Sequence, residues 1–100
     1  METAIIIIST DAHFIKYAIN RMIDDSLSNI IERVLCPKDF EVLIDELINE
    51  NFRSYTIILD ENTPFYEKVE IQNILSKNEN QIHYNFIYGL ELVDDFYESR

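Results

Sequence analysis

The side chains best suited to chemistry in this chain are one aspartate, two histidines and a cysteine. Asp60 directly follows the unbroken apolar run 55–59, which reads YTIIL. If this run is a buried strand of an open α/β sheet, Asp60 lies at the strand's carboxyl end, where such sheets place ligands and reactive groups. In the structural alternative, the carboxylate solvates its loop and stabilises the amino end of the next helix.

The histidines and the cysteine lack the neighbours that catalysis requires. His13 falls in the first turn of an expected helix, where a solvent-facing position is more natural than a general base. His83 begins an expected strand, with no ligand type beside it. Cys36 precedes Pro37 and could be reactive at the amino end of a helix, but the chain has no C-x-x-C pattern and no obvious base, so an idle thiol is the alternative. Because glycine-rich nucleotide-binding patterns are also absent, we expect no enzyme and no catalytic residue.

Four strands are expected to position these groups. The runs 4–8 and 55–59 offer no polar side to water, which predicts central strands buried on both faces. The run 30–36 is interrupted by Glu32 and Arg33 and therefore resembles an edge strand. The run 82–88 alternates two sets of side chains, as in a strand with one buried and one partly solvated face: Tyr84, Phe86 and Tyr88 against His83, Asn85 and Ile87.

Helices are expected at 11–23, 37–49, 64–77 and 90–97, with Asp11 and Thr63 as capping residues. Each has an apolar stripe at helical spacing. The expected inner residues are Ile15, Ala18, Ile19, Met22 and Ile23, then Phe40, Leu43, Ile44, Leu47 and Ile48, then Phe65, Val69, Ile71, Ile74 and Leu75, and finally Leu90, Leu92, Val93, Phe96 and Tyr97. The alternation predicts one α/β domain over 1–100, in three layers, with a mostly parallel four-stranded sheet in the order 2-1-3-4.

One motif carries a family resemblance. The stretch DENTP at 60–64 is similar to the D-x-x-M-P stretch of response-regulator receiver domains, with Thr63 in place of the methionine. The resemblance extends over positions 4 to about 90 and implies a truncated flavodoxin-like or receiver-like fold. It also implies that Asp60 occupies the phosphoacceptor position and that Pro64 opens the following loop and helix.

Other positions depart from the receiver pattern. The acidic pair that holds magnesium after the first strand is matched by Ser9-Thr10-Asp11, which keeps one acid, so the implied metal ligands are Asp11 and Asp60. Two carboxylates are a thin ligand set for Mg²⁺, and no other cofactor is expected. The region around Tyr88 supplies no small hydroxyl, and no fifth strand with its lysine is expected. The resemblance is therefore to degenerate, shortened receivers, such as those of atypical LuxR-type regulators and stand-alone pseudo-receivers.

The net charge indicates which partners to expect. Nineteen acidic against eight basic side chains give −11, which argues against direct binding to nucleic acid or to an anionic membrane. A protein partner, in particular a basic one, is compatible with this charge, although an acidic surface also serves solubility alone. A single cysteine and the lack of a basic signal segment predict a cytoplasmic protein.

The aromatic side chains near the end of the chain predict an interaction surface. They are Tyr84, Phe86, Tyr88, Phe96 and Tyr97. Without a fifth strand, the edge formed by 82–88 is open to pairing with another chain, which predicts a homodimer. In the alternative, the segment after residue 89 folds over this edge and the rings belong to the core.

Three functions are compatible with the sequence. The first is a non-catalytic regulatory domain in transcriptional or signalling control that acts by protein–protein contact and dimerises. The second is a small acidic inhibitor or nucleic-acid mimic from a phage or mobile element, which binds a basic protein. It predicts one continuous face of carboxylates: Glu41, Asp45, Glu46, Glu50 and Glu91. The third is a true receiver that is phosphorylated at Asp60.

Overall fold

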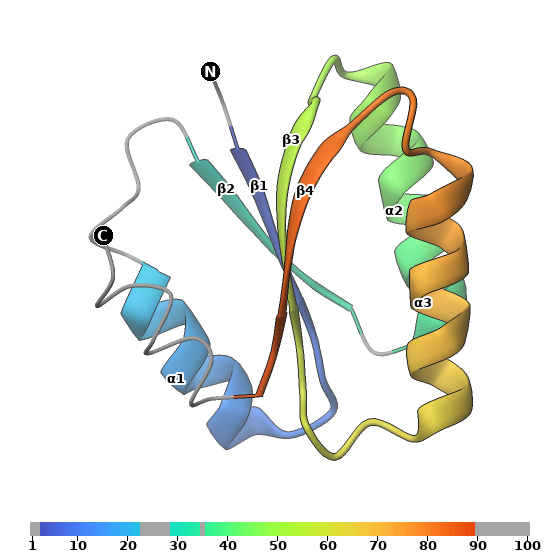
Figure 1. The fold of residues 1–100 in the computed structure, drawn as a ribbon. Coiled ribbons are helices and arrows are strands. Elements are labelled where there is room, and N and C mark those ends of the chain that lie inside the picture. Colours follow the sequence, from blue (N-terminus) through green and yellow to red (C-terminus); the bar gives the residue numbers. More distant parts are fainter. Residues whose placement is uncertain (1–2, 23–28, 35, 90–100) are drawn as a thin grey trace.

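The computed structural model of the protein describes residues 3–22, 29–34 and 36–89 (Figure 1). Strands and helices alternate along these ranges. The strands are β1 (Thr3–Ile8), β2 (Asn29–Val34), β3 (Ser54–Leu59) and β4 (His83–Tyr88). The helices are α1 (Ala12–Met22), α2 (Pro37–Asn49) and α3 (Phe65–Lys77). The expected α/β class is therefore confirmed, and the observed bounds lie close to those predicted.

The strands form one parallel sheet in the order β2-β1-β3-β4. In the register, Ile8 lies beside Leu59, and Leu59 lies beside Tyr88. Helices α2 and α3 cover one face of the sheet, and α1 covers the other (Figure 1). The carboxyl ends of β1, β3 and β4 consequently meet at one edge, where the loops after these strands lie close together.

The two central strands are buried on both faces, as their composition predicts. Successive side chains of a strand point to opposite faces, so β1 contributes to two separate apolar clusters. Ala4, Ile6 and Ile8 join the larger cluster beneath α2 and α3, whereas Ile5 and Ile7 join the smaller one beneath α1. β1 has no polar face because both of its faces pack against apolar side chains.

The inner faces of α1 and α2 agree largely with their predicted stripes. In α2, Phe40, Ile44 and Leu47 are buried, with Leu43 and Ile48 partly buried beside them. In α1, Ala18 is buried and Ile15 and Ile19 pack against the same cluster, as expected. Phe14 is also buried there, although the prediction omitted it. It precedes Ala18 by four residues and therefore lies on the same face of the helix.

The inner face of α3 corrects one prediction. Phe65 was expected in the core but is 78% exposed. The buried residues are Ile71, Ile74 and Leu75, and the same stripe passes one turn earlier through the half-buried Glu67 and Lys68. At about 100° per residue, Phe65 lies about 120° away from Ile71 around the helix axis, so its ring points away from the sheet.

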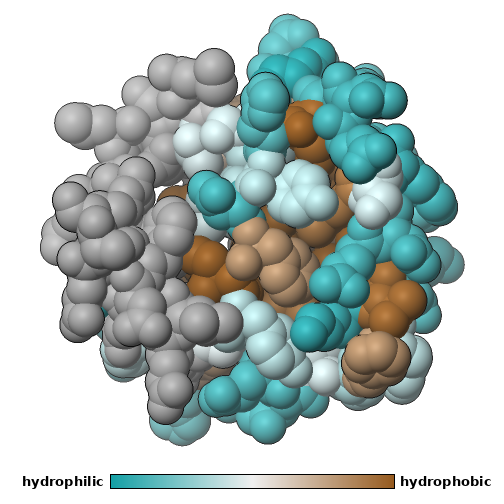
Figure 2. Space-filling model, viewed as in Figure 1, coloured by the Kyte–Doolittle hydropathy of each residue, from teal (hydrophilic) through white to brown (hydrophobic). Residues whose placement is uncertain are grey.

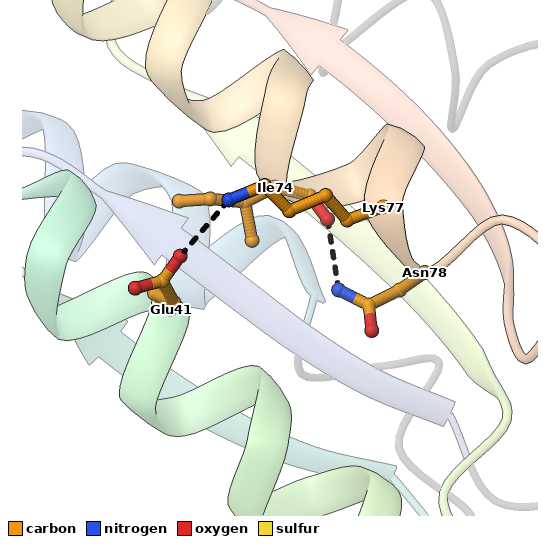
Figure 3. Close-up of polar contacts among 4 residues, drawn as sticks. All are labelled: Glu41, Ile74, Lys77 and Asn78. Carbon is orange, nitrogen blue, oxygen red and sulfur yellow. Dashed lines mark hydrogen bonds and ion pairs between the residues drawn. The ribbon is translucent and has the colours of Figure 1, made fainter.

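Polar contacts connect α2 with α3 and close the end of α3 (Figure 3). The Lys77 ammonium lies 3.7 Å from a carboxylate oxygen of Glu41 on α2. The Asn78 side-chain amide donates a hydrogen bond of 2.8 Å to the carbonyl of Ile74, which would otherwise lack an intrahelical partner. The ion pair is exposed, so we assign the packing of these helices to Ile74 and its apolar neighbours.

Two further expectations concern the helices. The expected cap at Thr63 is not formed, because α3 has Pro64 at its N-cap and no side-chain hydrogen bond there. The fourth expected helix, at 90–97, and Ile23 lie outside the described residues. None of the helices in the described ranges is long and apolar enough to cross a membrane.

Tyr55 makes the stability of the folded state depend on pH in the alkaline range. Its hydroxyl is buried and donates a hydrogen bond of 2.9 Å to the carbonyl of Phe52. Burial raises the pKa of Tyr55 from 10.0 to about 12, because a phenolate would be poorly solvated there, while the charge of Arg53 acts in the opposite direction. The folded state therefore favours the protonated phenol. This contribution to stability is complete below pH 10 and is lost as the pH rises through 12.

We expect the free energy of unfolding to fall by about 2 kcal/mol more between pH 10 and pH 12 in the wild type than in Tyr55→Phe. The phenylalanine variant cannot ionise at this position, although it loses about 1 kcal/mol from the missing hydrogen bond at neutral pH. Urea unfolding of both proteins over this interval measures the difference. Parallel pH profiles would contradict the assignment.

Candidate functional site

The candidate site lies where β1 and β3 end side by side. Because Ile8 and Leu59 are paired in the register, the residues that follow them, Ser9 and Asp60, come together although they are 51 positions apart. The Ser9 hydroxyl donates a hydrogen bond of 2.6 Å to Oδ2 of Asp60. Ser9 is 4% exposed and Asp60 is 5% exposed. This is a short, charge-assisted contact in a buried setting, where such bonds contribute most.

The remaining polar groups of Asp60 close the turn into α3. Oδ1 of its carboxylate accepts a hydrogen bond of 2.9 Å from the backbone N–H of Asn62. Its backbone carbonyl accepts one of 3.0 Å from Thr63, and its own N–H donates one of 3.1 Å to the carbonyl of Ile8. Both carboxylate oxygens therefore have donors from the chain itself, and the side chain stabilises the loop between β3 and α3.

Asp11 lies on the other side of Ser9 and caps α1, as the sequence predicts. Oδ1 of its carboxylate accepts hydrogen bonds from the backbone N–H groups of His13, at 2.8 Å, and Phe14, at 3.4 Å. The Asp11 N–H donates to the Ser9 hydroxyl oxygen at 2.9 Å. The Ser9 hydroxyl thus connects the two loops, since it accepts from Asp11 and donates to Asp60.

The arrangement contains few of the oxygen ligands that a magnesium ion requires. Mg²⁺ prefers six oxygen ligands in nearly octahedral geometry. In the described part of the chain, no three side chains of His, Cys, Asp or Glu are grouped so that they could hold a metal ion. Asp11 and Asp60 come near each other through Ser9, but their carboxylates accept hydrogen bonds from the loops.

Two hollows border these loops. The smaller has a volume of about 80 Å³ and lies between the loops after β1 and β3, beside Ser9, Asp60 and Pro64. The larger, of about 400 Å³, lies along α1 and includes His13, Lys16 and Tyr17 in its wall. A hollow of about 80 Å³ holds only a few water molecules. Asp60 also lines the larger hollow, together with Asp11 and Asn62.

The other candidates for chemistry lie on separate elements. His13 is exposed in the first turn of α1, and His83 is exposed at the first residue of β4. Cys36 is half-buried at the N-cap of α2, with no side-chain hydrogen bond to the helix. The structure does not bring these three groups together into one site.

The aromatic side chains of β4 are only partly buried. Tyr84 is 40% exposed, while Phe86 and Tyr88 are half-buried and pack against the cluster beneath α2 and α3. The expected division into one buried and one partly solvated face is wrong in detail, because Ile87 is buried on one face while Tyr84 is exposed on the other. Burial changes along the strand: its first half is exposed, and its second half is covered. Phe96 and Tyr97 lie outside the described residues.

Among the residues that the structure describes, the backbone groups on the outer edge of β4 have no strand partner. The N–H groups of His83 and Gly89 donate to carbonyls of the β3 chain segment, at 2.7 and 2.9 Å. Because successive residues direct their N–H and C=O groups to opposite sides, those of Tyr84, Phe86 and Tyr88 point away from β3. Within the described ranges, β4 pairs with β3 alone. Figure 2 shows apolar surface over this strand in the middle of the molecule.

The carboxyl end of β4 is attached to the loop that contains Asp60. The Tyr88 hydroxyl donates a hydrogen bond of 2.9 Å to the carbonyl of Glu61, and the Lys68 ammonium lies 4.2 Å from the centre of the Tyr88 ring. A side chain at position 89 would contact Glu61 at 3.3 Å, and the backbone there has φ +88, so glycine is required. These contacts fix the position of the aromatic edge relative to α3.

The sequence interpretation missed two features of this region. Ser9 was not identified as the partner of Asp60, although both residues directly follow central strands and parallel neighbours place such residues together. The exposed pair Phe65 and Tyr66 was also missed, although its displacement from the apolar stripe of α3 could have indicated the exposure.

Comparisons with protein families, curated proteins and solved structures found no match to this chain.

Proposed function

We propose that this chain is a non-catalytic regulatory domain, resembling a degenerate response-regulator receiver, that acts by protein–protein contact and dimerises through β4. The observation that carries the proposal is the outer edge of β4, which pairs with no further strand within residues 3–22, 29–34 and 36–89. It combines outward backbone groups at Tyr84, Phe86 and Tyr88 with aromatic side chains and has no acidic or lysine side chain over the whole strand. Exposed edges are normally protected by such charges, so an uncharged aromatic edge favours pairing.

The fold supports the receiver-like part of this proposal. Four parallel strands in the order β2-β1-β3-β4, with helices on both faces, correspond to the first part of the flavodoxin-like order. Asp60 follows β3, where the resemblance puts the acceptor aspartate. We propose that Asp60 and Asp11 are remnants of a phosphorylation site whose present role is to hold the two loops, since their carboxylates already accept hydrogen bonds. A role in transcriptional or signalling control follows from the resemblance.

Light scattering over a dilution series, at low and high salt, tests the proposed dimer. Two copies of charge −11 repel each other, whereas the β4 surface itself carries no acidic side chain. Screening of the repulsion should therefore strengthen the dimer as salt is added. A monomer at all protein concentrations in both salts would refute dimerisation through this edge.

A second candidate, an acidic inhibitor or nucleic-acid mimic that binds a basic protein, is favoured by α2. Its outer surface exposes carboxylates at helical spacing: Glu41, Asp45, Glu46 and Glu50. Glu91, the fifth expected member of this face, lies outside the described residues. Binding of this kind weakens as salt is added. The sign of the salt dependence thus separates the two candidates.

A further inference from the structure

The beginning of α3 presents two large aromatic side chains to solvent. Phe65 is 78% exposed and Tyr66 is 64% exposed, and Pro64 before them is exposed as well. Other aromatic side chains, such as Phe40 and Tyr55, are almost completely buried. Figure 2 shows apolar surface at the lower right, over the beginning of α3. An exposed apolar patch costs solubility, and adjacent aromatic residues are typical anchors of protein interfaces.

Hydrogen bonds order the backbone on both sides of these residues. The carbonyl of Pro64 accepts hydrogen bonds from the N–H groups of Glu67 and Lys68, at 3.0 and 3.1 Å, which forms the first turn of α3 directly behind the aromatic pair. On the other side, Asp60 holds Asn62 and Thr63 and is itself held by Ser9. A surface that is already ordered loses little conformational entropy when it binds.

The charges around the pair indicate the chemistry of its partner. Glu61 and Glu70 are exposed on either side of the pair in the sequence, and Glu70 shares the helix face of Tyr66, four residues before it. The one basic side chain between positions 61 and 70, Lys68, lies over the ring of Tyr88. The patch is therefore apolar at its centre and acidic around it. A second copy of the chain would bring the same acidic charges to this patch and would be repelled.

We propose that Pro64, Phe65 and Tyr66 form a docking site for a protein segment that carries lysine or arginine side chains around bulky apolar ones. The partner's basic groups would pair with Glu61 and Glu70, while its apolar groups would cover the two rings. This inference rests on the proposed role as a protein-interaction domain. It is independent of β4, whose outer edge is a different surface.

A random peptide library displayed on phage, selected on the wild-type protein, provides the probe. Peptides that also bind the double variant Phe65→Ser/Tyr66→Ser are removed by counter-selection as general binders. Since this variant keeps every charge of the chain, binding driven by the acidic surface alone is removed in this step. We expect the remaining peptides to combine basic residues with a bulky apolar residue, and their affinity to fall about tenfold or more in the double variant.

Titration calorimetry of the selected peptides measures the affinities, with Val42→Ser as the matched control. Val42 is an exposed apolar side chain on α2, so its loss changes the surface in the same way at a different place. The affinity should be unchanged in this control and should decrease as salt is added. Selected peptides without basic residues, equal affinity for the double variant, or no enrichment would each overturn the docking site.

The mass of the double variant in solution separates this inference from the proposed dimer. Phe65 and Tyr66 do not belong to β4, so the variant should self-associate like the wild type. A dimer without peptide binding would refute the docking site alone. Peptide binding by a protein that is always a monomer would support the docking site and refute the dimer.

Discussion

Replacing Asp60 by alanine should lower the free energy of unfolding by about 3 kcal/mol. The substitution removes the hydrogen bonds that the carboxylate accepts from the Ser9 hydroxyl and the Asn62 N–H. Hydrogen bonds to a charged group contribute about 1.5 to 3 kcal/mol each, and a hydroxyl left unsatisfied in a buried position costs more than one that faces water. Urea unfolding followed by circular dichroism measures the change.

Three variants make this prediction specific. Asp60→Asn keeps an acceptor for the Asn62 N–H and should cost less, about 1 to 2 kcal/mol, because only the contact with the Ser9 hydroxyl is altered. Ser9→Ala removes the other side of that contact and should cost a similar amount. Glu79→Ala, at an exposed position, should change the stability by less than about 0.5 kcal/mol. Equal stabilities of Asp60→Ala and Glu79→Ala would show that the buried contacts contribute little.

This result would also bear on the phosphoacceptor hypothesis. A carboxylate that attacks phosphorus must offer a lone pair that the phosphoryl donor can reach. In this structure each oxygen of Asp60 already accepts one hydrogen bond, from Ser9 and from Asn62, and the side chain is 5% exposed. Phosphorylation would therefore require the buried loop to open. A large loss of stability in Asp60→Ala thus favours the structural role, in which an aspartate retained after the strand holds two loops together.

The central part of the fold could be predicted because its signals are local. The apolar runs 4–8 and 55–59 can be covered on both faces only between two layers, and the structure buries every residue of both runs. The stripe of α2 repeats at helical spacing over the whole helix, so its phase is fixed by several residues. The orientation of α3 around its axis is harder to predict, because its inner face continues through the charged residues Glu67 and Lys68. The apolar Phe65 was therefore wrongly placed on that face.

The contacts of the candidate site depend on information that the sequence does not carry locally. The capping of α1 by Asp11 could be predicted, since acceptor and donors are two and three residues apart. The contact between Ser9 and Asp60 arises from the register of two parallel strands and connects residues 51 positions apart. The exposure of Tyr84 likewise depends on which elements cover each half of β4, a property of the packed molecule.

Replacing Tyr84 by glutamate should weaken the proposed dimer about a hundredfold. If two β4 strands pair antiparallel about a twofold axis at Phe86, the outward groups of Phe86 bond to those of its copy, and Tyr84 lies opposite Tyr88 of the other copy. All three side chains then lie on one face, next to their counterparts. The variant removes two cross-strand aromatic pairs and brings two carboxylates into the interface, which together cost about 3 kcal/mol.

Tyr84 is the most suitable position for this test because it is 40% exposed, whereas Phe86 and Tyr88 also support the monomer's own core. Gln72→Glu adds the same charge at an exposed position of α3 and should leave the dimer unchanged apart from a small increase in repulsion. Tyr84→Phe keeps the ring and should dimerise like the wild type. Only a charge at the true contact has to be desolvated when the two copies associate. A dimer that persists in Tyr84→Glu and dissociates in Gln72→Glu would therefore place the interface on the helices and away from β4.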